Sequence, residues 1–444
     1  MTTSHTDFRE IARTAVKRAL GKGAQEAAAT INRRRNVSVD WRDGKIEKIE
    51  EATTRGLSLQ LYVDGRYSQV SSSDLRPEAL ATFIADSIAM TRVLAEDPFR
   101  RLPDPALYQG RATTDLQLED PAYAGVTPEQ RRKAAQEMEE AARAVKGAEV
   151  ILSVSTGFQD TRNESFRVAS NGFEGNRVDT VFFCSAQVSV KDADGRRPEE
   201  YDFAGSRFLG QVPPIGQIGR RAAERALARL GAKKAPSAVM TLVLDNRAAG
   251  RLIGALAQPL TGGALQQKRS FLEGKIGQPI GNPLFDVADD PLIPKAFGSR
   301  LYDGEGLAAK RMPVFEKGVL RNYYLDTYYA KKLQLAPTTA GASNLVWALG
   351  PKSQPEILKD VGEGILVTGF IGGNSNGTTG DYSFGVQGFR LRGGERAEPV
   401  GEMNIAGNML DLLKKLAAVG NDPWPYSSLR TPTLVFEGVQ FAGV

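Results

Sequence analysis

The chain has 444 residues, of which 41% are hydrophobic and 25% are charged, the composition of an ordinary soluble globular protein. This length exceeds what one hydrophobic core usually serves, so two domains are expected. The 57 basic and 52 acidic residues are interspersed and leave a formal charge of +5, which argues against nucleic-acid binding.

Histidine and cysteine, on which many catalytic sites depend, are almost missing. Cys184 is the only cysteine and His5 the only histidine. This pair supplies neither an intrachain disulfide, nor a zinc site of the usual kind, nor a Ser-His-Asp or Cys-His catalytic group. Cys184 lies in an apolar, strand-like run and is expected to be an unreactive core residue. We therefore predict no metal and no conventional catalytic residue in this chain.

The N-terminus lacks the pattern of a signal peptide, and no apolar run is long enough to span a membrane. A cytoplasmic protein without membrane contact is expected. Apolar residues then recur at helical spacing from Phe8 to Leu20 and from about Arg76 to Leu94. Between these helices the sequence alternates as strands do, with hairpin turns at Asp43–Gly44 and Asp64–Gly65.

A third helix has a well-marked start, with Thr127 as N-cap, Pro128 at the first position and Gln130 completing a capping box. The pattern runs to about Val145, and a further helix is predicted from Ile215 to Leu230. Strands are predicted between these two helices, at Val150–Ser155, Arg162–Ser170, Gly175–Val190 and Tyr201–Gly205.

Gly231 to Pro236 interrupts the pattern and predicts a domain boundary. Residues 1–232 are then an α+β domain, and residues 233–444 are a β-rich, barrel-like domain. The second domain opens with a strand at Val239–Leu244 and a helix from Arg247 to about Leu260. Short strands punctuated by glycine follow, with a helical pattern at Asn404–Val419.

The segment Gly369–Phe389 interleaves glycines with apolar residues and predicts strand, turn and strand. Two interpretations stay open. It either lines a cavity in which an extended peptide lies, or it is simple tight β-packing. In the first, Gly373 and Gly377 leave room for a peptide backbone, and Tyr382 is an apolar anchor. Asp381 caps the turn or contributes to the cavity.

Five short motifs in order carry a resemblance to the TldD/TldE (PmbA) family. They are Arg269–Leu272, Asp289–Pro291, Tyr302–Gly306, Gly372–Asn374 with Thr379–Phe384, and Pro399–Glu402 with Ile405–Met409. In TldD-type members, the helix after the Val239–Leu244-like strand carries a His-Glu-three-residues-His motif that binds zinc. In this sequence Ile253 and Gly254 occupy the first His and the Glu, and Gln258 the second His.

The resemblance is therefore to the TldE (PmbA) branch, which lacks the zinc ligands. It implies a heterodimer with a TldD-like partner that holds the zinc, while this chain shapes the cavity for unfolded or flexible peptides, including precursor peptides to be processed. Two rival functions remain: a homo-oligomeric peptide-binding or chaperone-like protein, and an autonomous hydrolase with a Ser or Lys nucleophile.

Candidate substrate-binding residues also have ordinary structural interpretations. Asp303 and Glu305 lie in a glycine turn and could bind a cation, the partner or substrate, but capping of the turn by Asp303 is the preferred interpretation. Arg269 either anchors a peptide carboxylate or forms an ordinary ion pair. The full set of candidates is Arg269, Asp303, Glu305, Gly373, Gly377, Asp381 and Tyr382.

Overall fold

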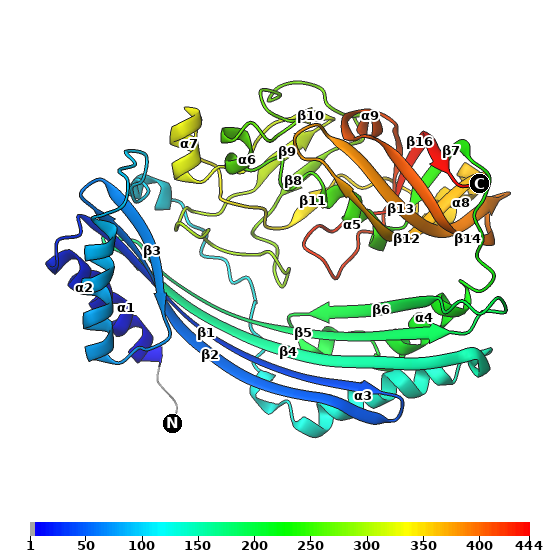
Figure 1. The fold of residues 1–444 in the computed structure, drawn as a ribbon, viewed down its shortest axis with the longest axis horizontal. Coiled ribbons are helices and arrows are strands. Elements are labelled where there is room, and N and C mark those ends of the chain that lie inside the picture. Colours follow the sequence, from blue (N-terminus) through cyan, green and yellow to red (C-terminus); the bar gives the residue numbers. More distant parts are fainter. Residues whose placement is uncertain (1–4) are drawn as a thin grey trace.

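The computed structural model describes residues 5–444, with side chains from residue 8 onward. Figure 1 shows a long curved sheet with helices on its outer face and the C-terminal half of the chain over its inner face. All strands of the curved sheet come from residues 26–206, and those of the other two sheets from residues 238–442. The predicted α+β architecture with a barrel-like C-terminal part is confirmed. Within the described residues no helix is both long and apolar enough to cross a membrane.

Six antiparallel strands form the curved sheet in the order β3-β2-β1-β4-β5-β6. The bounds are β1 (Glu26–Arg42), β2 (Lys45–Val63), β3 (Arg66–Ser72), β4 (Ile151–Ala169), β5 (Glu174–Val190) and β6 (Glu199–Ser206). The prediction of two strands in place of β4 is wrong. Polar residues interrupt its apolar pattern near Asp160, but that stretch stays paired with both β1 and β5. Neighbours on both sides thus hold it extended.

Two pairs of helices cover the outer face of the sheet. α1 (His5–Gly21) and α2 (Pro77–Thr91) cover one end and bury residues such as Ile31 and Leu59. α3 (Pro128–Arg143) and α4 (Ile215–Leu227) cover the other end, around Phe182. Core-facing residues alternate along each strand, so the residues between them face the C-terminal half.

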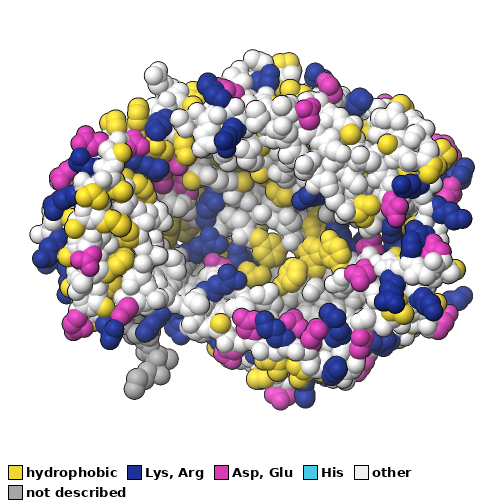
Figure 2. All heavy atoms as spheres, in the orientation of Figure 1, with side chains coloured by type: hydrophobic (Ala, Val, Ile, Leu, Met, Phe, Trp, Pro, Cys, Tyr) yellow, Lys and Arg dark blue, Asp and Glu magenta, His cyan; other side chains and the backbone are white. Residues whose placement is uncertain are grey.

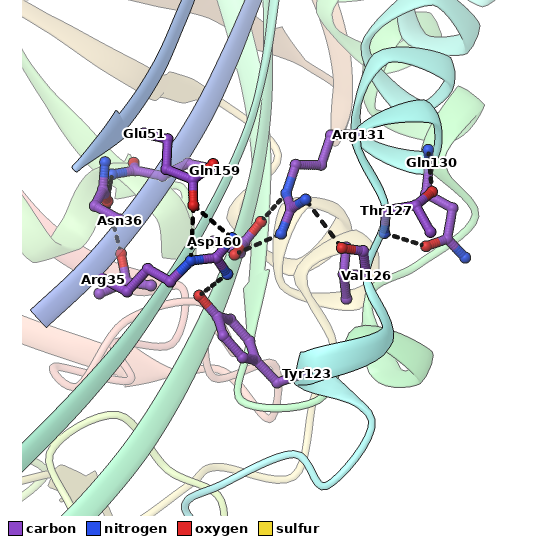
Figure 3. Close-up of polar contacts among 11 residues, drawn as sticks. Arg35, Asn36, Glu51, Tyr123, Val126, Thr127, Gln130, Arg131, Gln159 and Asp160 are labelled. Atoms are coloured by element: carbon purple, nitrogen blue, oxygen red, sulfur yellow. Dashed lines mark hydrogen bonds and ion pairs between the residues drawn. The ribbon is translucent and has the colours of Figure 1, made fainter. Parts of the chain in front are cut away.

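The start of α3 is tied to the sheet by a buried ion pair, shown in Figure 3. Arg131 donates to both carboxylate oxygens of Asp160 on β4, at 2.5 and 3.1 Å, and both side chains are almost fully buried. Arg35 on β1 donates to the Tyr123 hydroxyl at 3.4 Å, and burial raises the pKa of Tyr123 to about 12. The predicted capping box of Thr127 and Gln130 is confirmed, with both of its hydrogen bonds present.

Five strands of the C-terminal half close into a barrel. The sheet order is β14-β13-β12-β7-β16-β15, and pairing between β14 and β16 closes the ring with β15 outside it. The bounds are β7 (Ala238–Leu244), β12 (Gly364–Ser375), β13 (Asp381–Arg392), β14 (Glu395–Asn408), β15 (Leu416–Val419) and β16 (Leu434–Ala442). The predicted strand, turn and strand of the glycine segment are confirmed as the β12–β13 hairpin.

A second sheet of short strands, in the order β10-β9-β8-β11, and several short helices pack around the barrel. The strands are β8 (Val287–Asp289), β9 (Met312–Glu316), β10 (Val319–Leu320) and β11 (Leu345–Trp347). The helices are α5 (Asn246–Gly254), α6 (Gly262–Gln266), α7 (Thr327–Leu333), α8 (Gln354–Val361) and α9 (Met409–Lys414).

Two predicted helices in this half differ from the structure. The helix expected to reach about Leu260 ends at Gly254, and residues 255–260 continue as turns. The helix expected at Asn404–Val419 is instead the end of β14, the short α9 and β15. Its buried residues Ile405, Leu412 and Leu416 do recur at nearly helical spacing. Pairing of residues 404–408 with β13, and of Asn404 and Ile405 with β16, overrides that local preference.

The two halves touch at several places, two of which lie at α7 and β6. At α7, the Tyr328 hydroxyl donates to Asp97 Oδ2 at 2.8 Å, and the Arg100 guanidinium lies 3.5 Å from the centroid of the Tyr328 ring. At β6, the Phe203 ring packs edge-on against Trp424, with centroids 5.6 Å apart. Between these contacts the molecule is hollowed, and hydrophobic and charged side chains are visible inside (Figure 2). The curved sheet thus forms one wall of an open interior.

Candidate functional site

The sheet wall of this interior carries amide and hydroxyl side chains. Asn36 on β1 accepts hydrogen bonds from Gln159 Nε2 at 2.6 Å and from Thr161 Oγ1 at 2.8 Å, both on β4. Further along, Asn163 Nδ2 donates to Asp179 Oδ1 on β5 at 3.1 Å. The amide and hydroxyl groups offer donors and acceptors to a peptide backbone, and Asp179 is a charged group beside them. Sequence reasoning missed this wall, although its signal is present as polar residues alternating with core-facing ones.

The β12–β13 hairpin packs against α5 and the segment that follows it. Phe271 N donates to Gly377 O at 3.0 Å, and Arg251 Nη2 donates to Gly373 O at 3.3 Å. A Cβ added to Gly377 would lie 2.0 Å from Gln258 Oε1. The structure therefore brings the hairpin together with one of the three motif positions and with the Arg269–Leu272 motif.

The two candidate glycines of the hairpin differ in what they require. Gly373 has a φ of +101°, and a Cβ there would lie 2.1 Å from the carbonyl oxygen of Ser383. Both the backbone conformation and the close approach of β13 thus require glycine at this position. Gly377 meets only the end of the exposed Gln258 side chain and the ring of Pro259.

The candidates at the start of β13 have structural partners. Asp381 is exposed and accepts hydrogen bonds from Thr379 Oγ1 at 2.6 Å and Asn408 Nδ2 at 3.0 Å, which lower the pKa of its carboxyl. Tyr382 is buried in the barrel core, and burial raises its pKa to about 12. Its ring stacks beside Phe384, with centroids 5.7 Å apart. The apolar residue that the hairpin exposes is Ile371, at 49%.

Asp303 and Glu305 lie apart from the hairpin, in a loop against the β4–β5 turn, where the Tyr302 and Phe173 rings have centroids 5.1 Å apart. Asp303 Oδ1 accepts from the backbone N–H groups of Glu305, Gly306 and Leu307, so it caps the turn. Glu305 accepts from the backbone N–H and the hydroxyl of Thr327, the first residue of α7. Burial raises the pKa of Glu305. Arg269 is exposed.

The three motif positions do not share one helical face. Ile253 is buried in the core, Gly254 is the last residue of α5, and Gln258 is exposed in the turns beyond it. Isoleucine and glycine side chains cannot ligate zinc. Among the residues whose side chains are described, no group of three or more His, Cys, Asp or Glu is placed to hold a metal ion. His5 lies outside those residues. The residues described here therefore do not fit a catalytic zinc.

Cys184, on β5, is fully buried beneath the outer helices. Burial raises the pKa of its thiol to about 12, so the thiolate needed for nucleophilic attack is not formed at neutral pH.

Comparison with known proteins gives three consecutive family matches. Residues 27–91 match the PmbA/TldA metallopeptidase domain 1, residues 122–230 its central domain, and residues 237–443 its C-terminal domain. The "Metalloprotease PmbA" of Escherichia coli O157:H7 is 28% identical over 98% of this chain and 96% of its own. The "Metalloprotease PmbA homolog" of Haemophilus influenzae is 26% identical over 98% and 96%.

Solved structures also match this chain over nearly its whole length. A putative modulator of DNA gyrase from Bacteroides thetaiotaomicron is 39% identical, covers 100% of both chains and superimposes with a TM-score of 0.96. TldE from Thermococcus kodakarensis is 18% identical and covers 98% of this chain and 100% of its own, with a TM-score of 0.85. The second likeness shows that the fold is shared.

Proposed function

The chain belongs to the TldD/PmbA family of metallopeptidases, and on this premise we propose that it is the non-metal, TldE-like subunit of a two-subunit cytoplasmic peptidase. Its substrates would be unfolded or flexible peptides, including precursor peptides to be processed. A TldD-like partner would hold the zinc, which activates water and polarises the scissile carbonyl when bound.

The observation that carries this proposal is the state of the motif positions. Ile253, Gly254 and Gln258 stand at the three motif positions but supply neither metal ligands nor a general base. The rest of the scaffold is kept, since all three domain models match in order over the chain. A retained scaffold without these groups supports a role in holding peptide for chemistry on another subunit.

The chain's own residues would bind and orient peptide. The amide wall of Asn36, Gln159 and Asn163 suits a backbone held by hydrogen bonds, which only an extended chain exposes. A folded protein has already paired its backbone groups and would be rejected. Under this proposal the wall contributes to substrate capture and leaves the chemical step to the partner.

The test is to purify this chain alone and co-expressed with a TldD-like subunit, and to measure mass, zinc content and hydrolysis of an unfolded peptide. We expect zinc and activity only in the complex. Gln159→Ala in the complex should raise KM with kcat little changed. Activity of the isolated chain would contradict the proposal and favour an autonomous hydrolase. A stable homo-oligomer that binds peptide and ignores the partner would favour the peptide-binding alternative.

A further inference from the structure

A cavity of about 230 Å³ lies where α4, on the outer face of the sheet, meets the barrel. Its walls carry four arginines. Arg221, Arg225 and Arg229 lie four residues apart along α4 and the turn after it, and Arg396 lies on β14. Residues four apart share one face of a helix, so the first three project together. We call this space the junction cavity.

The arginines around the junction cavity have few counter-charges. Among the described residues, the one ion pair of these four arginines joins Arg221 to Asp202 at 2.7 Å. Arg247 on α5, beside the cavity, lies 3.7 Å from the same Asp202. Arg229 is only 8% exposed, and its Nη1 donates to the carbonyl of Val400 rather than to a carboxylate. Burial lowers the pKa of Arg229, and the charge of Glu200 on the cavity wall offsets part of that effect.

Unused donors are a second feature of the site. Arg221 Nη2 and Arg247 Nη1 are both buried and have no hydrogen-bond partner. The Arg247 side chain is 4% exposed and stacks 3.9 Å from the centroid of the Tyr201 ring. Burial lowers the pKa of Arg247, and the like charge of Arg225 lowers it further. Buried donors are normally paired, so Arg221 on the cavity wall and Arg247 beside it each keep capacity for a further acceptor.

Two of the three carboxylates on the cavity wall already accept hydrogen bonds from the protein. Asp245 caps α5 by accepting from Arg247 N, and its other oxygen accepts from Gln354. Glu200 accepts from Gln387 Nε2 at 2.7 Å; burial raises its pKa, while the charges of Arg229, Arg247 and Arg225 act to lower it. Glu224 is exposed to solvent. Their charges offset part of that of the arginines: four arginines and three carboxylates line the junction cavity, which leaves an excess of one positive charge.

We propose that the junction cavity binds a small oxyanion, a phosphate or a carboxylate, between Arg225 and Arg229 on one side and Arg396 on the other. Guanidinium groups bind such anions through paired N–H···O bonds, and the cavity volume accommodates one. Because the two walls belong to the two halves of the chain, the bound anion ties α4 to the barrel. This site is independent of the peptide-binding role.

The experiment is a titration of the full chain with inorganic phosphate and, in a second arm, with succinate, by calorimetry at fixed ionic strength in chloride. The test variant is Arg225→Gln, which removes a half-buried guanidinium that lacks an ion pair. The matched control is Arg220→Gln, an exposed arginine on the same helix. We expect wild type and the control to bind one anion per chain, and Arg225→Gln to bind at least tenfold more weakly. Whichever anion binds more tightly, phosphate or succinate, identifies whether the ligand is a phosphate or a carboxylate.

Thermal unfolding gives a second, opposite-signed readout. Without phosphate, Arg225→Gln should be at least as stable as the control, because it relieves repulsion from Arg247. With phosphate, it should be less stable, because ligand binding stabilises only the chains that bind. Arg396→Gln should weaken binding similarly if the anion bridges the walls, and unchanged binding in that variant would overturn the bridge. Equal binding by Arg225→Gln and the control, or no binding of either anion by wild type, would overturn the site.

Discussion

Single residues in this protein are governed mainly by whether the fold buries them. Asp303 and Glu305 share a five-residue motif, yet one closes its own turn while the other accepts hydrogen bonds from Thr327 at the start of α7. The sequence allowed the first role to be predicted, since Asp before Gly commonly caps a turn. It held no signal for the second, because Thr327 lies 22 residues away.

The buried thiol gives a direct test at this scale. With a pKa of about 12 and no solvent access, Cys184 should not react with a thiol reagent at pH 8 in the native protein. One equivalent should react after unfolding in denaturant, measured by absorbance of the released chromophore. Labelling of the native chain at the rate of a free thiol would contradict the burial of β5 beneath α3 and α4.

Glu305 should make stability depend on pH in a defined direction. Burial raises its pKa above the ordinary value of 4.5, so the folded state holds the proton more tightly than the unfolded state. Its contribution is therefore fully present below pH 4.5 and is lost as pH rises through the folded pKa. Relative to Glu305→Gln, wild type should lose stability over that window in denaturant titrations. Relative to Glu356→Gln, wild type should instead gain stability as pH rises, because hydrogen bonds from Ser353 lower the pKa of Glu356.

At the scale of elements, local patterns predicted helices and turns better than strand lengths. The capping box of α3 and the β12–β13 hairpin follow from residues close in sequence. β4 did not, because its polar middle is held extended by β1 and β5 rather than by its own pattern. The single helix predicted across β14, α9 and β15 is wrong for a related reason. Residues at helical spacing there pack into one barrel core from three separate elements.

The hairpin glycines provide the element-scale prediction. Gly373→Ala should destabilise the protein by about 1–3 kcal/mol, because φ is positive and β13 leaves no room for a Cβ. Gly377→Ala should be much milder, since only the flexible end of Gln258 must move. Thermal unfolding of the two variants side by side measures the difference. Equal losses would mean that the turn itself, rather than the approach of β13, sets the requirement.

At the scale of the molecule, the sequence indicated a mixed first part and a β-rich second part, and the barrel is confirmed. The division into residues 1–232 and 233–444 stays a prediction. The hollow interior and its amide wall could not be foreseen, because they depend on how far the long strands curve and on contacts such as Tyr328 with Asp97. Such contacts join residues hundreds of positions apart and leave no local pattern.

The closure of the barrel also sets the order in which the protein can be made. β7 lies between β12 and β16, and β16 is the last strand of the chain. On the ribosome, β7 must therefore wait for its second neighbour on the order of ten to forty seconds at ordinary rates of synthesis. The curved sheet needs only residues 26–206 and can form during that time. A chain that stops before Leu434 should keep a protease-resistant N-terminal sheet while its C-terminal half is degraded, which limited proteolysis of the truncated product would show.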